Sequence, residues 1–197
     1  MKLHKIILYL TIIFLISCQT KKNLTSTLEV SILNEAFMDM IGTIPYKYHS
    51  LRPAPNDSIY LTTDTLNVAI TPYLTNIRNW KRDISAWSDD IKGEDGRHII
   101  ALFEKSERDS LPIAFATSQF KNTGRYKLFP YAKKSISIDT LSAIGKLSFS
   151  RTYFDDVYAI TVATIRDHIK NGIVKLFLLE KRSGVWCKKE EYILEIW

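Results

Sequence analysis

The stretch VYAITVATIRDHIKNGIVKLFLLEKRSGVW, residues 157–186, decides the fold of this 197-residue chain. It consists of runs rich in Val, Ile, Thr and Leu, which are common in β-strands. Asn171-Gly172 and Ser183-Gly184 separate the runs. Asn-Gly is the strongest short hairpin signal, because both central residues of that turn need positive φ. Strands joined in this way pair antiparallel, so the stretch predicts a meander.

The run at residues 172–181 is apolar on both of its faces. Side chains alternate between the two faces of a strand. Two apolar sets therefore point in opposite directions: Ile173, Phe177 and Leu179, and Val174, Leu176 and Leu178. A strand with two apolar faces is covered on both. The sequence therefore predicts a central strand that lies between two layers.

Three further strands are predicted beside it, at residues 145–155, 157–169 and 185–197. In the first of these, three side chains are predicted to share one face: Leu147, Phe149 and Tyr153. The last strand begins with the charged residues 188–191. It is then predicted to turn three apolar side chains to the core: Tyr192, Leu194 and Ile196.

An amphipathic helix is predicted between Ser26 and Gly42. Its apolar residues recur at helical spacing and form one stripe: Leu28, Ile32, Leu33, Ala36, Phe37, Met40 and Ile41. Ser26 and Glu29 fit a capping box, and Gly42 is placed to end the helix. Glu29, Glu35 and Asp39 lie on the predicted polar face, which anionic lipid would repel. The helix is therefore expected to pack on the sheet.

Residues 43–144 have weaker patterns. Ile77, Trp80, Ile84 and Trp87 recur at helical spacing and predict a short helix over residues 76–90. Residues 92–98 are expected to form a loop, and no element is predicted for residues 121–144. Further strands are predicted at residues 58–65, 66–74, 97–105 and 111–120. The predicted fold is α+β, with the N-terminal helix packed on a mainly antiparallel sheet that ends in a C-terminal four-stranded meander.

The N-terminus has the features of an export signal. Lys2 and Lys5 precede a stretch without charge at residues 6–16. At about 1.5 Å per helical residue, this stretch covers about half of the roughly 30 Å of hydrocarbon in a bilayer. Its length therefore favours a signal over a permanent anchor. The following Leu15-Ile16-Ser17-Cys18 resembles the lipobox of bacterial lipoproteins.

The lipobox resemblance implies that the Cys18 thiol carries diacylglycerol and that residues 1–17 are cleaved off. Each buried methylene contributes about 0.8 kcal/mol, so two or three acyl chains hold a protein at a membrane permanently. Residues 18–26 would form a lipidated tether and residues 27–197 a single domain. Gln19 stands where an aspartate signals retention at the inner membrane in such families. The resemblance therefore implies an outer-membrane lipoprotein of the bacterial envelope that faces the periplasm or the medium. A cleaved signal with an incidental cysteine is the alternative.

A second resemblance covers the helix and the C-terminal strands. The segments LNEAFMDMIGT (33–43), GKLSFSRTYFD (145–155) and LEKRSGVW (179–186) are similar to those of a group of small lipoproteins of Bacteroidota. No activity is known for that group, so the resemblance implies neither a substrate nor a cofactor.

The charge balance excludes one class of partner. The formal charge of the chain is +6, and removal of Lys2 and Lys5 with the signal leaves +4. Nucleic-acid binding would need a concentrated basic stripe, whereas the basic pairs of this chain are scattered. No nucleic-acid partner is expected. Once Cys18 is acylated only Cys187 remains, so no internal disulfide can form, and Cys187 is predicted to be a buried or half-buried strand residue.

No metal or cofactor is expected. His49, His98 and His168 lie far apart in the sequence, and no Cys-x-x-Cys or His-x-x-x-His spacing occurs. Four carboxylates fall close together near residue 92, but they miss the alternating register of a calcium loop, which favours a solvated loop: Asp89, Asp90, Glu94 and Asp95. The chain also lacks the Gly-x-Ser-x-Gly elbow of many hydrolases.

Two groups of rings are candidates for a binding surface: Tyr46, Tyr48 and His49 in a proline-rich segment, and Trp80 with Trp87. Exposed rings can stack on sugars or contact a peptide or protein. The two tryptophans also fit a role as core residues of an amphipathic helix, and we favour this role. The leading hypothesis is a non-enzymatic binding or accessory lipoprotein with a protein, peptide or glycan partner. The alternatives are an envelope hydrolase acting on glycan or peptide, and an immunity-type inhibitor lipoprotein.

Overall fold

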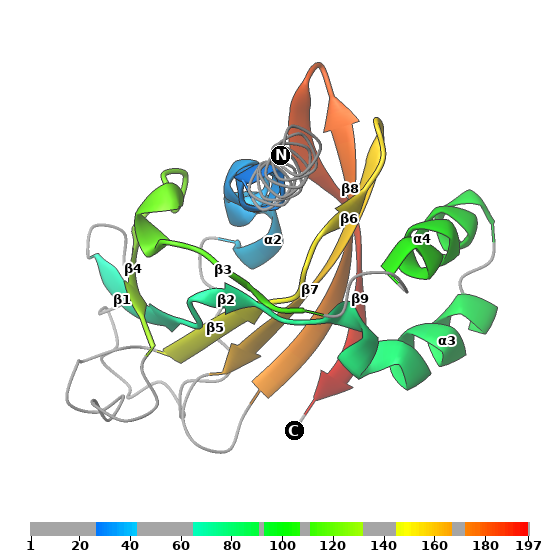
Figure 1. Ribbon diagram of the computed structural model, residues 1–197, viewed down its shortest axis with the longest axis horizontal. Coiled ribbons are helices and arrows are strands. Elements are labelled where there is room, and N and C mark those ends of the chain that lie inside the picture. Colours follow the sequence, from blue (N-terminus) through cyan, green and yellow to red (C-terminus); the bar gives the residue numbers. More distant parts are fainter. Residues whose placement is uncertain are drawn as a thin grey trace, which may run out of the picture.

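A computed structural model of the chain describes residues 27–42, 65–90, 93–106, 111–131, 145–166 and 172–196, without the side chains of residues 86–90. The predicted signal peptide and tether lie outside these ranges, as do residues 58–64 of the strand predicted at residues 58–65. Within them, no helix is both long and apolar enough to cross a bilayer. The α+β fold class is confirmed, with helices on a mixed, mostly antiparallel sheet (Figure 1).

The main sheet has the strand order β4-β1-β5-β7-β8-β9, and β6 also pairs with β7. The C-terminal meander is confirmed, because β5, β7, β8 and β9 follow one another as antiparallel neighbours. The other side of the sheet is parallel, since β1 runs parallel to both β4 and β5. The strands of this sheet are β1 Leu66–Ile70, β4 Tyr126–Pro130, β5 Gly145–Phe149, β6 Tyr153–Phe154, β7 Tyr158–Arg166, β8 Gly172–Arg182 and β9 Val185–Ile196.

Strand β8 was predicted to be covered on both faces, and this prediction is confirmed. One of its faces contributes Ile173, Phe177 and Leu179 to a first hydrophobic core. The opposite face contributes a different set to a second core: Val174, Leu176 and Leu178. Strand β8 lies one place from the sheet edge, and the edge strand β9 follows it through a tight turn.

That turn uses Ser183 and Gly184, which have φ of 51° and 84°. Positive φ at both central residues matches the twist of a two-residue hairpin. Cys187 lies half-buried in β9, as predicted. Ile196 is 64% exposed, so the prediction that it faces the core was wrong. The end of β9 extends beyond the residues that cover the sheet.

The predicted first strand is interrupted. Leu147 and Phe149 belong to the first core, but Tyr153 belongs to the second, so the predicted common face was wrong. The cause is the segment Ser150–Thr152 between β5 and β6. There the N–H of Arg151 donates to the carbonyl of Thr75 at 2.6 Å, and the chain leaves the ladder before β6 joins β7.

The N-terminal helix is confirmed over residues 27–35, with a bend at Ala36 and a continuation as α2, Phe37–Ile41. It packs on the first core, and Gly42 ends it with φ of 76°. The predicted stripe is correct except at its start. Leu28 is 45% exposed, while Glu29 is buried against the sheet. Two carboxylates of the helix, on Glu35 and Asp39, accept the N–H groups of Trp186 and Lys188 on the edge strand β9.

The second core is covered by a 3-10 turn, η2 (Ile77–Trp80), and two helices, α3 (Lys81–Asp90) and α4 (Glu94–Lys105). The helix predicted at residues 76–90 is confirmed. The strand predicted at residues 97–105 was wrong, because these residues belong to α4. The loop predicted at residues 92–98 was wrong from Glu94 onward for the same reason. Ile99 and Leu102 pack inward at helical spacing, and Glu94 and Asp95 favour the positively polarised N-terminal turn of a helix.

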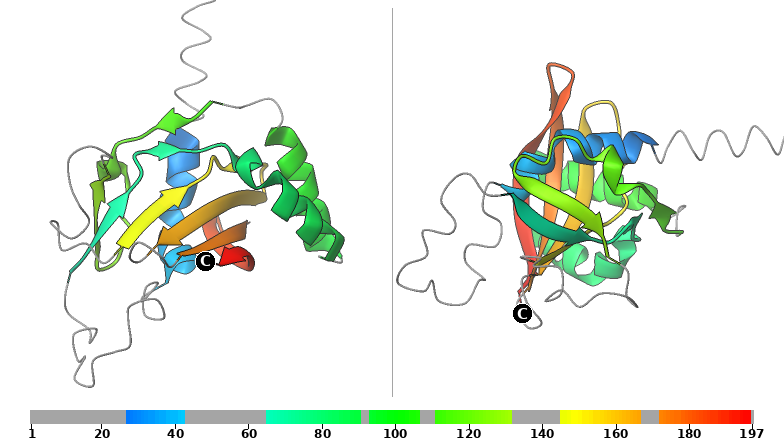
Figure 2. Two further views of the ribbon diagram at one scale, coloured as in Figure 1. Left: turned by 90° about the horizontal axis from the view of Figure 1, so that it is seen from below. Right: turned by 90° about the vertical axis from the view of Figure 1, so that its left-hand side faces the viewer.

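A small second sheet consists of two short strands, β2 (Tyr73–Leu74), which follows β1 in the chain, and β3 (Ile113–Ala114), which follows α4. The predicted strand at residues 66–74 therefore divides into β1 and β2. The strand predicted at residues 111–120 is confirmed only over its short segment β3, which is followed by the 3-10 turn η4 (Thr117–Gln119). The N-terminal helix and the α3–α4 pair lie on opposite sides of the strands (Figures 1 and 2).

Candidate functional site

Most of the site residues predicted from sequence lie outside the described residues: the lipid-attachment residue Cys18, and the binding residues Tyr46, Tyr48 and His49. Trp80 ends η2 and is partly buried against the second core, the place expected of a core tryptophan. Trp87 lies in α3, but its side chain is outside the described part of the structure. Of the rings predicted to form a binding surface, the structure therefore describes that of Trp80 alone.

The four carboxylates near residue 92 are divided between two helices. Asp89 and Asp90 end α3, and Glu94 and Asp95 form the first turn of α4. Among the described residues, no group of three His, Cys, Asp or Glu side chains is placed to hold a metal ion.

A polar seam joins α4 to β7 and β9. Lys189 Nζ lies 2.6 Å from Asp95 Oδ1 and 5.0 Å from the centre of the Tyr158 ring. The His98 ring stacks on that of Tyr158, with the two ring centres 3.9 Å apart. The hydrogen bond to Asp95 raises the pKa of Lys189 above its ordinary value. These contacts, which we call the α4 seam, position the helix on the sheet.

A buried ion pair holds the N-terminal helix on the other face. Arg151 Nη2 lies 2.6 Å from Glu29 Oε1, and the side chains are only 7% and 1% exposed. The second Glu29 oxygen accepts the N–H of Thr152 at 3.0 Å. A buried charge is tolerated when it is paired and hydrogen-bonded. Glu29 is therefore a fixed contact between the helix and the β5–β6 segment, and not the exposed capping residue that the sequence predicted.

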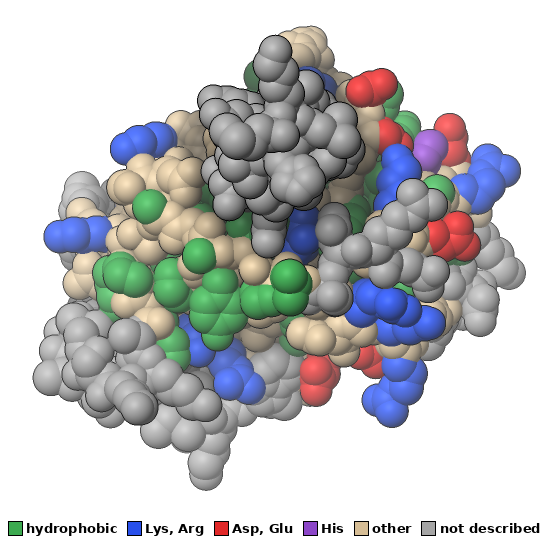
Figure 3. Space-filling view, viewed as in Figure 1, with side chains coloured by type: hydrophobic (Ala, Val, Ile, Leu, Met, Phe, Trp, Pro, Cys, Tyr) green, Lys and Arg blue, Asp and Glu red, His purple; other side chains and the backbone are tan. Residues whose placement is uncertain are grey.

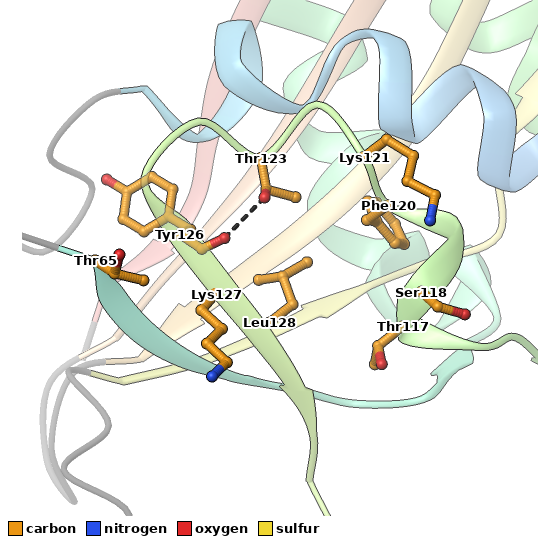
Figure 4. A pocket seen from close by; sticks show the side chains of 9 residues that line it. All are labelled: Thr65, Thr117, Ser118, Phe120, Lys121, Thr123, Tyr126, Lys127 and Leu128. Atoms are coloured by element: carbon orange, nitrogen blue, oxygen red, sulfur yellow. Dashed lines mark hydrogen bonds between the residues drawn. The ribbon is translucent and has the colours of Figure 1, made fainter.

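A pocket of about 440 Å³ lies at the free edge of the sheet, beside β4 (Figure 4). One wall is β4 with Lys127 and Leu128, and the facing wall is the segment with Thr117, Ser118 and Lys121 (Figure 4). We call this the edge pocket. It is lined by Thr65, Thr117, Ser118, Phe120, Lys121, Thr123, Tyr126, Lys127 and Leu128.

The walls of the edge pocket are anchored to the N-terminal helix. Asn34 Oδ1 accepts the backbone N–H groups of Lys121 and Asn122, at 2.5 and 3.0 Å. Gly124 has φ of 57°, and a Cβ atom there would lie 2.8 Å from the sulfur of Met38. The left-handed φ therefore favours glycine at this position, whereas the contact with the flexible end of the Met38 side chain alone would not require it.

Two aromatic side chains continue from the pocket into the first core. Phe120 lies 5.7 Å from the ring of Phe37, and Tyr126 lies 6.4 Å from it. Burial raises the pKa of Tyr126 to about 12, although Arg125 opposes the shift. The phenol is thus neutral and serves packing. The polar groups left for a ligand are the lysines and hydroxyls at the rim.

The described lining of the edge pocket contains two lysines and four serine or threonine residues, and no carboxylate. Such a lining suits an anion. Sequence analysis missed it, since it predicted no element for residues 121–144. The sequence signal was weak: Lys121 and Lys127 flank the Asn-Thr-Gly turn of residues 122–124.

A second, smaller pocket of about 210 Å³ has the opposite character. It lies between the N-terminal helix and the β8–β9 hairpin, and carries Glu35, Asp155 and Asp156 beside Lys181. Burial alone would raise the pKa of Asp155, but the N–H groups of Tyr158 and Val157 lower it below its ordinary value. Such a carboxylate stays ionised, whereas a general acid or base near neutral pH needs a raised pKa.

Side chains of different kinds gather on different parts of the surface. Figure 3 shows a band of hydrophobic side chains over β2 and β3, where Tyr73 and Leu111 are exposed, and charged side chains over α3 and α4. No protein family, no curated protein and no solved structure matches this chain.

Proposed function

We propose that this chain is a lipid-anchored protein of the bacterial envelope that serves as a non-enzymatic binding or accessory module. The observation that carries the proposal is Leu15-Ile16-Ser17-Cys18, placed directly after a short positive segment and an apolar run. In this account Cys18 is acylated, residues 1–17 are removed, and the domain is held at the outer membrane by its lipid.

The structured domain begins close to the proposed anchor. Thr27, the first described helical residue, lies nine positions after Cys18. At no more than about 3.3–3.6 Å per residue, the tether reaches about 30 Å. The helix that follows is fastened to the sheet by the buried Glu29–Arg151 pair. A domain held in this way stays near the bilayer. The edge pocket stays fixed relative to the helix, because Asn34 of the helix binds the backbone of the wall at Lys121 and Asn122.

The chemistry of the described pockets supports binding. The described residues that line the edge pocket offer hydroxyl and ammonium donors, and there is no carboxylate or histidine among them. In the second pocket, the Asp155 carboxylate already accepts hydrogen bonds from two backbone N–H groups. Rigid concave sites with a few convergent polar groups are typical of ligand binding.

The anchor is tested by metabolic labelling with radioactive palmitate in a bacterium that processes lipoproteins. We expect the full chain to be labelled and cleaved before Cys18, and Cys18→Ala to remain unlabelled and uncleaved. Cys187→Ala is the matched control, because it removes the chain's other thiol and leaves the lipobox intact. Labelling of Cys18→Ala, or loss of labelling only in Cys187→Ala, would contradict the proposal.

A further inference from the structure

We infer that the edge pocket binds an anionic sugar: a hydroxyl-bearing ring with one carboxylate, sulfate or phosphate group. The inference rests on the proposed binding function and names the class of ligand. It goes beyond the lipid anchor, which requires no ligand at all.

The charge of the pocket selects the anion. Lys121 and Lys127 are exposed and stand on opposite sides of the opening (Figure 4). Among the described residues that line the pocket there is no aspartate or glutamate, so none of them competes with a ligand for the lysines. Hydrogen bonds between an ammonium and an anion are shorter and stronger than neutral ones. An anionic ligand is therefore preferred over its neutral counterpart.

The remaining lining suits a sugar better than a bare anion. Hydroxyl groups of Thr65, Thr117 and Ser118 can donate to and accept from the hydroxyls of a ring. Leu128 and the edge of Phe120 offer apolar surface for its C–H groups. The volume of about 440 Å³ is larger than one small anion needs and falls within the range of small-molecule sites.

The same edge is poorly suited to an extended peptide. In β4, every second residue directs its backbone N–H and C=O groups to β1. The backbone groups of Tyr126, Leu128 and Pro130 therefore point away from β1, to the free edge. The N–H of Tyr126 donates to the carbonyl of Thr123, and its carbonyl accepts the Thr123 hydroxyl at 2.7 Å. Pro130 has no N–H to offer. Only Leu128 presents both groups, whereas strand addition needs a row of them.

The pocket is also pre-organised. The wall that carries Lys121 is held by Asn34, and the turn beside it by the fit of Gly124 against Met38. A site whose walls are already fixed loses little conformational entropy when the ligand binds. Binding should therefore leave the backbone of β4 and residues 117–124 in place.

The inference is tested by isothermal titration of the detergent-solubilised full chain. The probes are glucuronate, glucose 6-sulfate and glucose 6-phosphate, with glucose, inorganic phosphate and an acidic hexapeptide for comparison. We expect at least one anionic sugar to bind more tightly than glucose, phosphate or the peptide. Each of Lys121→Gln and Lys127→Gln should weaken this binding about tenfold or more, since charge-assisted hydrogen bonds are involved.

Lys81→Gln is the matched control, because Lys81 is exposed on α3 away from the pocket and should leave binding unchanged. The pocket variants should unfold like the original chain, since both lysines are exposed. The inference is overturned if no anionic sugar binds, if glucose binds equally well, or if the peptide binds best. Palmitate labelling without sugar binding removes this inference alone, and sugar binding without labelling removes the anchor alone.

Discussion

The two faces of the sheet hold their helices by different means. The N-terminal helix covers a first core of 23 buried residues, in which the rings of Phe37, Phe120 and Phe149 lie about 6 Å from one another. Helices α3 and α4 cover a second core of 10 buried residues, mostly aliphatic. Among the described residues, the first core therefore contains more than twice as many buried residues as the second.

The polar contacts differ in the same direction. The first face contains the buried Glu29–Arg151 pair, whereas the second relies on the α4 seam, where Lys189 and Asp95 are 23% and 25% exposed. Regions with few buried apolar contacts open at lower free energy than the core. We therefore expect the N-terminal helix to stay in place until the whole domain unfolds, and α4 to open on its own.

The largest effect is expected from Glu29→Gln. It leaves the Arg151 guanidinium buried beside a neutral amide, and breaking a buried pair in this way costs about 3–5 kcal/mol. Urea unfolding of the full chain measures the loss. Glu35→Gln is the control, because Glu35 lies on the same helix, only partly buried, and accepts the N–H of Trp186. A loss of stability for Glu29→Gln no larger than for Glu35→Gln would contradict the role assigned to the Glu29–Arg151 pair.

Leu179→Ala and Leu178→Ala form a matched pair. The two leucines are neighbours on β8, both 0% exposed, and they point into the first and the second core. Truncation of a buried leucine costs about 2–5 kcal/mol. We expect Leu179→Ala to cost more in global stability and Leu178→Ala to increase hydrogen exchange in α4 in particular. Equal costs with identical exchange patterns would mean that the two cores act as one.

A smaller effect is expected from Lys189→Met, which removes the ion pair of the α4 seam. Pairs with this degree of exposure contribute less than about 1 kcal/mol. The expected result is little change in the urea midpoint but faster exchange of the amides in α4. Unchanged exchange in α4 would show that apolar packing alone holds the helix.

The smallest effect concerns pH. Because the pKa of Asp155 is lowered in the folded protein, its contribution to stability is present above the ordinary aspartate pKa. It is lost as pH falls below about 4 through the lowered value. Asp155→Asn should therefore weaken the loss of stability in acid. Asp156→Asn, at the exposed neighbouring position, should leave the acid profile unchanged, and an equal effect of both would contradict the assignment.

Sequence patterns predicted the C-terminal half well because its contacts are local. Strands β7, β8 and β9 pair with their neighbours in the chain, and the two apolar faces of β8 are visible in the alternation of Ile, Leu, Val and Phe. Positive φ at Ser183 and Gly184 fits the turn expected there. The break at residues 150–152 escaped prediction, since it depends on Thr75, which is distant in the sequence.

The middle of the chain was harder because its signals were ambiguous or long-range. Ile99 and Ile100 favour a strand locally, but Ile99 and Leu102 pack on the sheet as one helical face, and the acidic start at Glu94 was the missed indication of a helix. The edge pocket depends on pairing of β4 with β1, about sixty residues earlier. No local pattern in residues 121–131 announces that pairing.

Hydrogen exchange of the full chain under native conditions, followed by mass spectrometry, tests the central claim most directly. The claim is that the N-terminal helix and the edge pocket form one rigid unit while the α3–α4 face opens separately. We predict that amides of residues 27–41 exchange only by global unfolding, with those of β8, and that amides of α4 exchange at lower free energy. Exchange of residues 27–41 that is as fast as that of α4 would contradict it.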